Sequence, residues 1–369
     1  MDRRQFIAKA GLGAAGVAAG ASALAAPAIA QSSPEVRWRM TSAFTKALDT
    51  IYGTGEAFTR AVAEATDGKF QIQSFATTEI VPTAGIVDAV QDGTVEMGHT
   101  ASYYYFGKDP TFALGTAVPF GLNSRMLNAW MYFGGAMDLL NEFYAKYNIY
   151  GLPGGNTGAQ MGGWFRKEIN SVADINGLKM RIAGLGGIVM AKLGLVPQTL
   201  AVPEIYPSLE KGAIDATEFV GPYDDEKLGF DKVAKYYYYP GWWEGGAMLH
   251  FFINRDAWAK LPPSYQAIVK TAASEANVMM QARYDAVNPP AIRRLAAKGV
   301  QVRPFSADIL RACFEASKEV YAELNAKSPD FKKVYDSMVA FRGEEYLWFQ
   351  LADGTFDNFM YAQQRAGAL

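Results

Sequence analysis

The stretch that decides the fold begins at Val36-Arg37-Trp38-Arg39-Met40-Thr41-Ser42-Ala43 and runs to Thr100. β-Branched, aromatic and other apolar residues are interleaved with polar ones over its first eight positions, a pattern typical of a β-strand. Four more segments follow in regular alternation: a helical pattern over 52–65, a strand over Phe70–Phe75, a helix over Ala84–Gln91 and a strand over Val95–Thr100. This order predicts a parallel sheet with helices on both faces.

The same alternation returns later in the chain. The later segments are a strand over Leu178–Ile182, helices over Ile188–Leu193 and Pro203–Gly212, and a strand over Ile214–Val220. We also expect one amphipathic helix over 124–147, an apolar strand over Met248–Ile253, and helices from Pro262 onward with breaks at Pro289-Pro290 and Pro304. The two runs predict two α/β lobes, and ligands favour the cleft between such lobes at the carboxyl ends of strands.

Composition excludes several classes of protein. Half of the 369 residues are hydrophobic and 13% are aromatic, so the chain is not intrinsically disordered. A net charge of −2 provides no basic surface for nucleic acid, which we do not expect as a partner. The single cysteine, Cys313, excludes an intramolecular disulfide, and we expect it buried on a helix. The two histidines, His99 and His250, are expected to be hydrogen-bonded core residues.

The amino terminus has the pattern of an export signal. Arg3-Arg4 precede an uncharged, Ala- and Gly-rich stretch over 10–30, which ends in the small-residue site Ala28-Ile29-Ala30. We therefore interpret residues 1–30 as a signal peptide, and the paired arginines resemble a twin-arginine signal. Ordinary secretion and a membrane anchor are the alternatives. The formal dinucleotide motif over Gly11–Gly16 is accidental, because no strand precedes it.

The middle of the chain carries the charged residues with chemical potential. Arg181 lies among apolar strand neighbours and fits a carboxylate clamp, although pairing with a neighbouring glutamate is an equally good interpretation. Glu218 and Glu244 each adjoin aromatic residues and could supply hard oxygen ligands to Na⁺ or Ca²⁺, or form ordinary salt bridges. Gln160 could contact either a solute or a cation, or be a plain loop residue.

Three segments together resemble a known family. They are Gln160-Met161-Gly162-Gly163-Trp164-Phe165, the Met180-Arg181 pair and the run from Gly212 to Asp225. They are similar to solute-binding proteins of tripartite ATP-independent periplasmic (TRAP) transporters, and Tyr236–Glu244 resembles the branch that binds 2-oxo monocarboxylates such as pyruvate. The resemblance covers essentially the whole chain after residue 30. It implies the α/β, two-lobe periplasmic fold with mixed sheets, a central cleft and long C-terminal helices.

The resemblance also implies the lobe boundaries. Residues 31–155 are expected to be mainly lobe 1, and residues 156–246 mainly lobe 2 with the ligand site. Residues 247–369 return to lobe 1 as a strand and continue as a helical C-terminal region.

The resemblance further implies roles for individual residues. Arg181 would pair with the solute carboxylate, and Gln160 would contact both solute and cation. Glu218, Glu244 and the backbone carbonyl of Phe219 would bind a cation that bridges to the solute. The family commonly has tryptophan where this chain has Phe219, which preserves the backbone ligand but alters the pocket wall. The usual cation of this branch is sodium, whereas a lactate-binding relative looks calcium-dependent.

Charge counting bears on the cation independently. Glu218, Glu244 and a bound carboxylate outnumber Arg181 by two negative charges, which is costly away from water. One Ca²⁺ neutralises this excess, whereas one Na⁺ leaves a single negative charge. Charge alone therefore favours calcium, against the sodium of most of the branch.

Aromatic residues suggest further contacts. Tyr103 and Tyr104 follow a predicted strand, and either phenol could hydrogen-bond a solute oxygen or pack in the core.

Near the carboxyl end, an apolar stripe recurs at helical spacing. Such a stripe normally packs on its own domain, yet some relatives exchange a long terminal helix between two chains. A homodimer with a swapped C-terminal helix is therefore a hypothesis. The stripe comprises Phe331, Val334, Tyr335, Met338 and Phe341.

The functional expectation is a periplasmic receptor, not an enzyme. It would bind one small 2-oxo or 2-hydroxy monocarboxylate with one cation, expected to be Na⁺ with Ca²⁺ as the alternative, and deliver the solute to a TRAP permease. Two alternatives stay open: a receptor of the same fold for a dicarboxylate or sugar acid, and a secreted metal-assisted enzyme acting on oxo acids. The sequence shows no nucleophile–base pair and no general-base motif, which disfavours the enzyme.

Overall fold

Two mixed sheets organise residues 34–368, the part of the chain that the computed structural model describes. Sheet A has the strand order β2-β1-β3-β10-β4. Its parallel part is β1, β2 and β3, and β10 runs antiparallel to both β3 and β4. The strands of sheet A are β1 (Val36–Ser42), β2 (Phe70–Phe75), β3 (Met97–Thr100), β4 (Ile149–Asn156) and β10 (Met248–Asn254).

Sheet B has the order β11-β9-β5-β8-β6-β7. Here β6 is parallel to β7 and β8, and β5 is antiparallel to β8 and β9. The α/β fold with mixed sheets is thus confirmed. The strands of sheet B are β5 (Gly163–Phe165), β6 (Lys179–Arg181), β7 (Val196–Gln198), β8 (Ala216–Thr217), β9 (Tyr236–Tyr239) and β11 (Gln301–Pro304).

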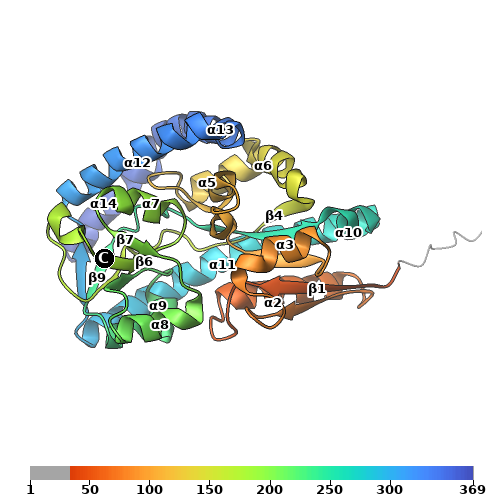
Figure 1. Ribbon diagram of the computed structural model, residues 1–369, viewed down its shortest axis with the longest axis horizontal. Coiled ribbons are helices and arrows are strands. Elements are labelled where there is room, and N and C mark those ends of the chain that lie inside the picture. Colours follow the sequence, from red (N-terminus) through yellow and green to blue (C-terminus); the bar gives the residue numbers. More distant parts are fainter. Residues whose placement is uncertain (1–33, 369) are drawn as a thin grey trace, which may run out of the picture. The chain divides into compact units, whose positions relative to one another are not determined.

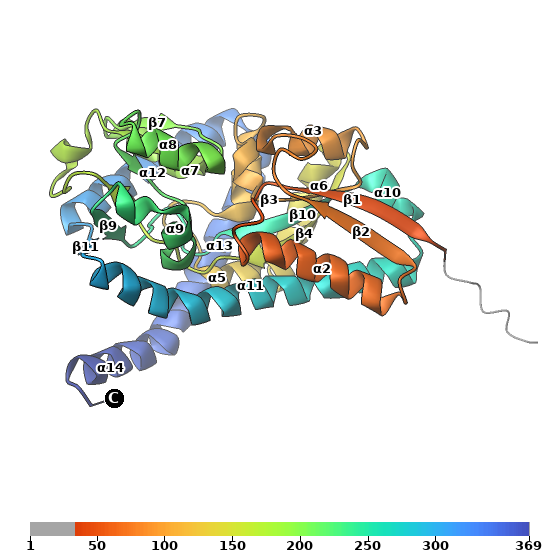
Figure 2. The same cartoon turned by 90° about the horizontal axis from the view of Figure 1, so that it is seen from below.

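Helices cover the sheets, and the longest of them contact elements of both. The helix α11 packs against α2 and β4 on the side of sheet A and then against α9 on the side of sheet B (Figure 2). The helices α12 and α13 run along the opposite side, over α7 and then over α5 and α6 (Figure 1). The helices are α2 (Ile51–Ala65), α3 (Ile86–Gln91), α4 (Ala113–Thr116), α5 (Ser124–Phe133), α6 (Ala136–Tyr144), α7 (Gly184–Lys192), α8 (Val202–Glu210), α9 (Pro222–Leu228), α10 (Arg255–Lys260), α11 (Pro263–Ala297), α12 (Ala307–Lys327), α13 (Pro329–Leu351) and α14 (Asp353–Arg365). Short 3₁₀ helices lie at Thr83–Gly85, Ser102–Tyr105, Pro110–Phe112, Ala145–Tyr147, Val172–Ile175 and Phe230–Lys232.

Two helix predictions were wrong. The segment 124–147 is not one helix, because α5 ends before Gly134 and Gly135 has a φ of 81°, a left-handed conformation that favours glycine. Pro289-Pro290 do not break α11. The missing amide hydrogens leave the carbonyls of Asp285 and Ala286 without their usual donors, but both residues are exposed and water can hydrogen-bond those carbonyls.

The predicted core positions of Cys313, His99 and His250 are confirmed. Cys313 is fully buried on α12, as expected, and burial raises the pKa of its thiol to about 12. His99 and His250 are also buried in sheet A, and burial lowers their pKa values to about 4 and about 3, so both rings are neutral. His99 Nε2 bonds the Gly154 carbonyl at 3.0 Å, but Nδ1 of each histidine has no partner within 34–368.

Candidate functional site

The site begins where two parallel strands of sheet B end. Arg181 is the last residue of β6 and Glu218 follows β8, so both side chains start from the same edge of the sheet. The predicted strand over Ile214–Val220 is shorter in the structure, where β8 is Ala216–Thr217, and the Glu218 amide still donates to the Arg181 carbonyl at 3.2 Å. Arg181 Nη1 then donates to Glu218 Oε1 at 2.6 Å and to the Glu218 carbonyl at 2.8 Å. Clamp and ion pair are therefore not exclusive, because both of these bonds use one guanidinium nitrogen.

Glu218 is divided between two environments. Its Oε1 atom accepts from Arg181 and from the Ala183 amide at 3.1 Å. Its Oε2 atom is buried and has no hydrogen-bond partner among the described residues. Burial raises the pKa of Glu218 to about 7, although Arg181 opposes the shift. One oxygen is thus fixed, while the other is available to a further electropositive group.

Glu244 and Gln160 are held side by side by the main chain. The Gln160 amide donates to the Glu244 carbonyl at 3.1 Å, and the Gly241 amide donates to the Gln160 carbonyl at 2.9 Å. The Gln160 side-chain amide donates to Thr157 Oγ1 at 3.1 Å. Burial and the charge of Glu218 raise the pKa of Glu244 well above its usual range. Glu244 Oε2 and Gln160 Oε1 are both buried and without a partner in the described part of the chain.

These atoms fit a bound cation. Three buried oxygens, one each from Glu218, Glu244 and Gln160, lack a hydrogen-bond donor within residues 34–368. Carboxylate and amide oxygens are the ligands that Na⁺ and Ca²⁺ prefer. No cluster of three His, Cys, Asp or Glu side chains is arranged to hold a metal among the described residues, so two carboxylates would need the amide, a backbone carbonyl and solute oxygens to complete the shell.

The two tyrosines approach from sheet A. Tyr103 and Tyr104 lie in the 3₁₀ helix that follows β3, at the carboxyl end of that strand. Burial, together with the charge of Glu244, raises the pKa of Tyr103 well above its usual range. Burial also raises the pKa of Tyr104, against the opposing effect of Arg181. Both phenols are therefore protonated and able to donate. A Cβ on Gly184, just after Arg181, would lie 3.2 Å from the Tyr103 ring, so the two sheets meet here.

One further candidate was missed by the sequence analysis. Asn156 ends β4, is fully buried, and accepts from the Gly158 amide through Oδ1 at 2.9 Å. Its Nδ2 donor has no partner in the described structure. Asn156 begins the loop that leads to Gln160, so its unpaired donor is close in sequence to one of the unpaired acceptors of the site. A polar residue at the end of a predicted strand would have been a signal for Asn156, but β4 was not predicted from the sequence.

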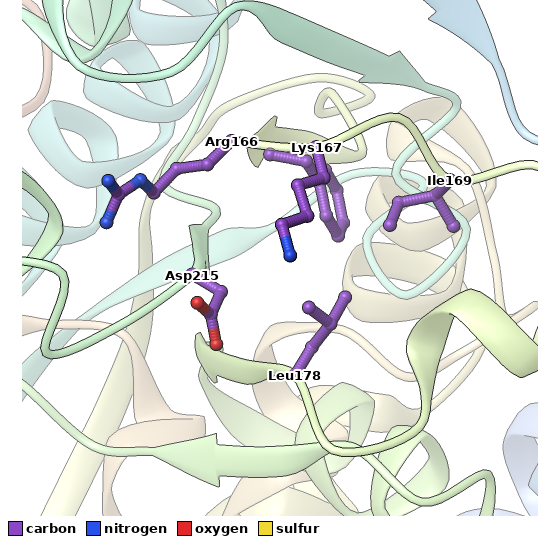
Figure 3. A pocket seen from close by; sticks show the side chains of 6 residues that line it. Arg166, Lys167, Ile169, Leu178 and Asp215 are labelled. Carbon is purple, nitrogen blue, oxygen red and sulfur yellow. The ribbon is translucent and has the colours of Figure 1, made fainter.

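A cavity elsewhere in sheet B is separate from these residues. It has a volume of about 340 Å³, and Figure 3 shows the Lys167 amine and the Asp215 carboxylate directed toward it. Leu178 and Asp215 precede β6 and β8, so the cavity lies at the amino ends of the strands whose carboxyl ends carry Arg181 and Glu218. The cavity is lined by Phe165, Arg166, Lys167, Ile169, Leu178 and Asp215.

Charged and polar groups gather at strand ends of two α/β sheets, an arrangement suited to binding a small charged solute. The family model described as bacterial extracellular solute-binding protein, family 7 (DctP), matches residues 41–328. The chain belongs to this family, which supplies the periplasmic solute-binding component of TRAP transport with a membrane permease.

Similar proteins narrow the comparison. A monocarboxylate 2-oxoacid-binding periplasmic protein of Nostoc sp. is 50% identical over 331 residues, covering 90% of this chain and 91% of the relative. A TRAP solute-binding protein of Bordetella bronchiseptica, solved as a mixed-occupancy dimer with copurified calcium and picolinate, has a TM-score of 0.89 at 49% identity and covers 90% of this chain and 99% of that one.

Two more solved TRAP proteins hold pyruvate. The protein of Colwellia psychrerythraea, with calcium and pyruvate, has a TM-score of 0.85 at 36% identity and covers 88% of this chain and 99% of its own. The protein of Pseudoalteromonas atlantica, with sodium and pyruvate, has a TM-score of 0.85 at 37% identity and the same coverage, 88% and 99%. Both cations of the sequence analysis thus occur in relatives.

The export prediction lies outside the described residues, because the structure describes nothing before residue 34. Between residues 34 and 368, no helix combines the length and the apolar character needed to cross a bilayer.

Proposed function

We propose that this protein is the TRAP receptor for a small 2-oxo monocarboxylate such as pyruvate, bound together with one cation. The observation that carries the proposal is a set of three buried oxygens, one each on Glu218, Glu244 and Gln160, that have no hydrogen-bond donor among residues 34–368. They accompany the buried guanidinium of Arg181. An anion alone would meet two carboxylates there, and a cation alone would leave Arg181 Nε and Nη2 without a carboxylate to clamp. The names and bound ligands of the relatives support the same pair.

Each residue has a distinct proposed role. Arg181 clamps the solute carboxylate, while its Nη1 keeps Glu218 oriented. Glu218, Glu244, Gln160 and the Phe219 carbonyl hold the cation, which offsets their charge and polarises nearby solute oxygens. Tyr103, Tyr104 and Asn156 donate hydrogen bonds to the solute. The roles require only binding, and we propose that no bond of the solute is broken.

The cation is the less determined part of this proposal. The site residues suit either sodium or calcium, and the raised pKa values of Glu218 and Glu244 show how costly their two charges are without it. Because Ca²⁺ offsets more of that charge, we propose that calcium binds more tightly and that sodium also supports solute binding.

Calorimetry tests the function directly. Pyruvate should bind in the micromolar range with calcium or sodium present, and binding should be lost with a chelator in sodium-free buffer. Lactate and longer 2-oxo acids should bind more weakly, and succinate should not bind, because one guanidinium matches one carboxylate. Tighter succinate binding would favour the dicarboxylate alternative, and turnover of any oxo acid would favour the enzyme.

Arg181 substitutions test the site. Arg181→Lys keeps the charge beside Glu218 but loses the planar fork, so pyruvate affinity should fall about 100-fold while the melting temperature of the apo protein changes little. Arg181→Met should abolish binding. The control is Arg303→Lys, since Arg303 makes an exposed contact with Glu168 and should leave pyruvate affinity unchanged.

Export, lobe boundaries and assembly complete the proposal. We propose that residues 1–30 direct export through the twin-arginine pathway, which Arg3→Lys with Arg4→Lys should block. We propose lobe boundaries at 31–155 and 156–246, with 247–369 returning to lobe 1. We also propose a homodimer that exchanges the C-terminal helix, because α14 buries none of its residues against the described part of its own chain.

A further inference from the structure

A carboxylate remote from the bound solute joins elements of the two sheets. Asp49 lies between β1 and α2, on the side of sheet A. Its Oδ2 atom accepts from the Tyr223 hydroxyl at 3.1 Å and from Arg283 Nη2 at 2.6 Å, and its Oδ1 atom pairs with Lys227 Nζ. Tyr223 and Lys227 belong to α9, which follows sheet-B strand β8. Three donors from α9 and α11 therefore converge on the Asp49 side chain, which lies in the connection between β1 and α2.

The helix α9 is fixed to the second half of α11. The Tyr223 amide donates to Asn288 Oδ1 at 3.1 Å, and the Tyr284 hydroxyl donates to Asp224 Oδ2. Glu226 adds ion pairs to Arg294 and Lys298 on the same helix. A displacement of sheet B from sheet A that carried α9 and this part of α11 together would therefore stretch the contacts to Asp49, along with those of α11 to α2 and β4.

The position of α9 links these contacts to the site. Only Phe219, Val220 and Gly221 separate Glu218 from the first residue of α9, Pro222. The Val220 carbonyl accepts from the amide of Met161, the neighbour of Gln160, at 3.1 Å. This bond keeps Gln160 with the Glu218 side of the site, so holding α9 against Asp49 holds Glu218 and Gln160 against the sheet-A element that carries Tyr103.

We propose that Asp49 is a positioning residue that fastens the two lobes over the bound solute and so sets the rate at which the solute leaves. The inference rests on the proposed function, since it concerns release of the solute from that site. Asp49 itself contacts neither solute nor cation. Partial burial opposes ionisation of Asp49, but the bonds from Lys227 and Tyr223 prevail and lower the pKa of its carboxyl.

The expected effect is moderate because the group is half exposed. The side chains of Asp49, Lys227 and Arg283 are 44%, 30% and 47% exposed. Exposed ion pairs contribute little singly, but three donors on one carboxylate should change the opening equilibrium by about three- to tenfold. Screening by salt should weaken the contact, so release should be faster at high ionic strength.

Stopped-flow fluorescence and calorimetry with pyruvate and calcium test the proposal. Asp49→Asn should raise the dissociation rate and the Kd by about three- to tenfold and change the association rate by less than twofold. It should also abolish most of the salt dependence of release. Lys227→Met should act in the same direction, and the double variant should be little worse than either single one. The matched control is Asp88→Asn, which removes the exposed Lys108 ion pair without crossing between sheets.

Two results would overturn the proposal about Asp49. One is an unchanged dissociation rate in Asp49→Asn, and the other is an equal change of that rate in Asp88→Asn. If wild-type protein bound no 2-oxo acid, the proposed function would fail instead. Small-angle scattering of the ligand-free protein then decides about Asp49 alone: a larger radius of gyration in Asp49→Asn than in wild type supports the fastening role, and an equal radius refutes it.

Discussion

In the proposed site, the backbone and the side chain of Phe219 have separate roles, one in cation binding and one in solute selection. Its proposed contribution to the cation is a backbone carbonyl, which any residue supplies. Its side chain is 4% exposed, and the ring lies 5.8 Å from the Arg181 guanidinium carbon, within reach of a cation–π contact. In the proposed site, the ring would therefore support the guanidinium that clamps the solute and would form part of the wall beside it.

Substitution of Phe219 should change solute preference and leave cation preference alone. Phe219→Ala removes the ring contact and opens space, so we expect pyruvate affinity to fall about three- to thirtyfold and affinity for a longer acid, 4-methyl-2-oxopentanoate, to fall less or to rise. The ratio of calcium to sodium affinity should stay constant. Calorimetry with both acids measures these quantities, and Phe219→Trp is the matched control that restores a ring. A loss of cation dependence in the alanine variant would contradict the proposed backbone ligand.

At the scale of elements, the contact between α9 and α11 contains a buried acid that is ionised only at a cost. Asp224 is fully buried, with one oxygen bonded to Tyr284 and the other without a partner in the described structure. Burial raises the pKa of Asp224 to about 7, although the Tyr284 hydroxyl opposes the shift. The folded protein therefore holds a proton there that the unfolded chain releases near its ordinary pKa of 3.8.

This acid predicts a pH dependence of stability with a definite sign. Because the folded-state pKa is raised, the protonated carboxyl stabilises the fold fully below pH 3.8, and this contribution is lost as the pH rises through about 7. Asp224→Asn cannot titrate, so the unfolding free energy of wild type minus that of the variant should fall from pH 4 to pH 8, by at most about 4 kcal/mol. Urea unfolding of the cation-free proteins measures it, with Asp308→Asn, an exposed position, as control. A difference that rises with pH would refute the assignment.

The elements also show what the sequence allowed us to predict. Hydrophobic patterning located β1 and β2 by their alternation, β10 by its continuous apolar run, and β3 by its place in the strand–helix rhythm. The strand β4 was missed, since Pro153, Gly154 and Gly155 lie within it. Asn156 was missed with it, because a buried unpaired donor depends on contacts distant in sequence. The resemblance implied that Arg181 and Glu218 share one site, and pairing of Arg181 with a glutamate was one of the two interpretations of that residue. That this glutamate is Glu218 could not be predicted from the sequence, because the bond depends on how two strands pair.

At the scale of the molecule, the proposed binding site takes residues from both sheets, and one chain supplies every residue that we propose to bind the solute or the cation. Sheet B supplies Arg181 and Glu218, sheet A supplies Tyr103 and Asn156, and the connections between the sheets supply Gln160 and Glu244. The C-terminal helices contribute none of these groups. We therefore expect that assembly through those helices can be changed without losing the solute site.

The exposed apolar residues of the C-terminal helices predict that the protein is a dimer. The first half of α13 packs on its own chain through Phe331, Val334 and Met338, and Arg125 pairs with Asp353 at the start of α14. Beyond these contacts α13 and α14 present large apolar side chains that are half to three-quarters exposed: Tyr346, Leu347, Trp348, Leu351, Phe356, Phe359 and Tyr361. A 13-residue helix is marginal alone, and an exposed apolar surface of this kind is typical of an interface.

We expect wild-type protein to be a dimer by light scattering across the micromolar range, because a second copy can bury these apolar faces. Trp348→Glu combined with Phe359→Glu should give a monomer, since each charge would be buried in the interface without a partner. The control is Gln364→Glu, which adds a charge at an exposed polar position of the same helix and should leave the dimer intact. Pyruvate affinity should change less than twofold in the monomer, because the site is complete in one chain. A monomeric wild type would refute helix exchange, and loss of pyruvate binding on dissociation would show that the partner completes the site.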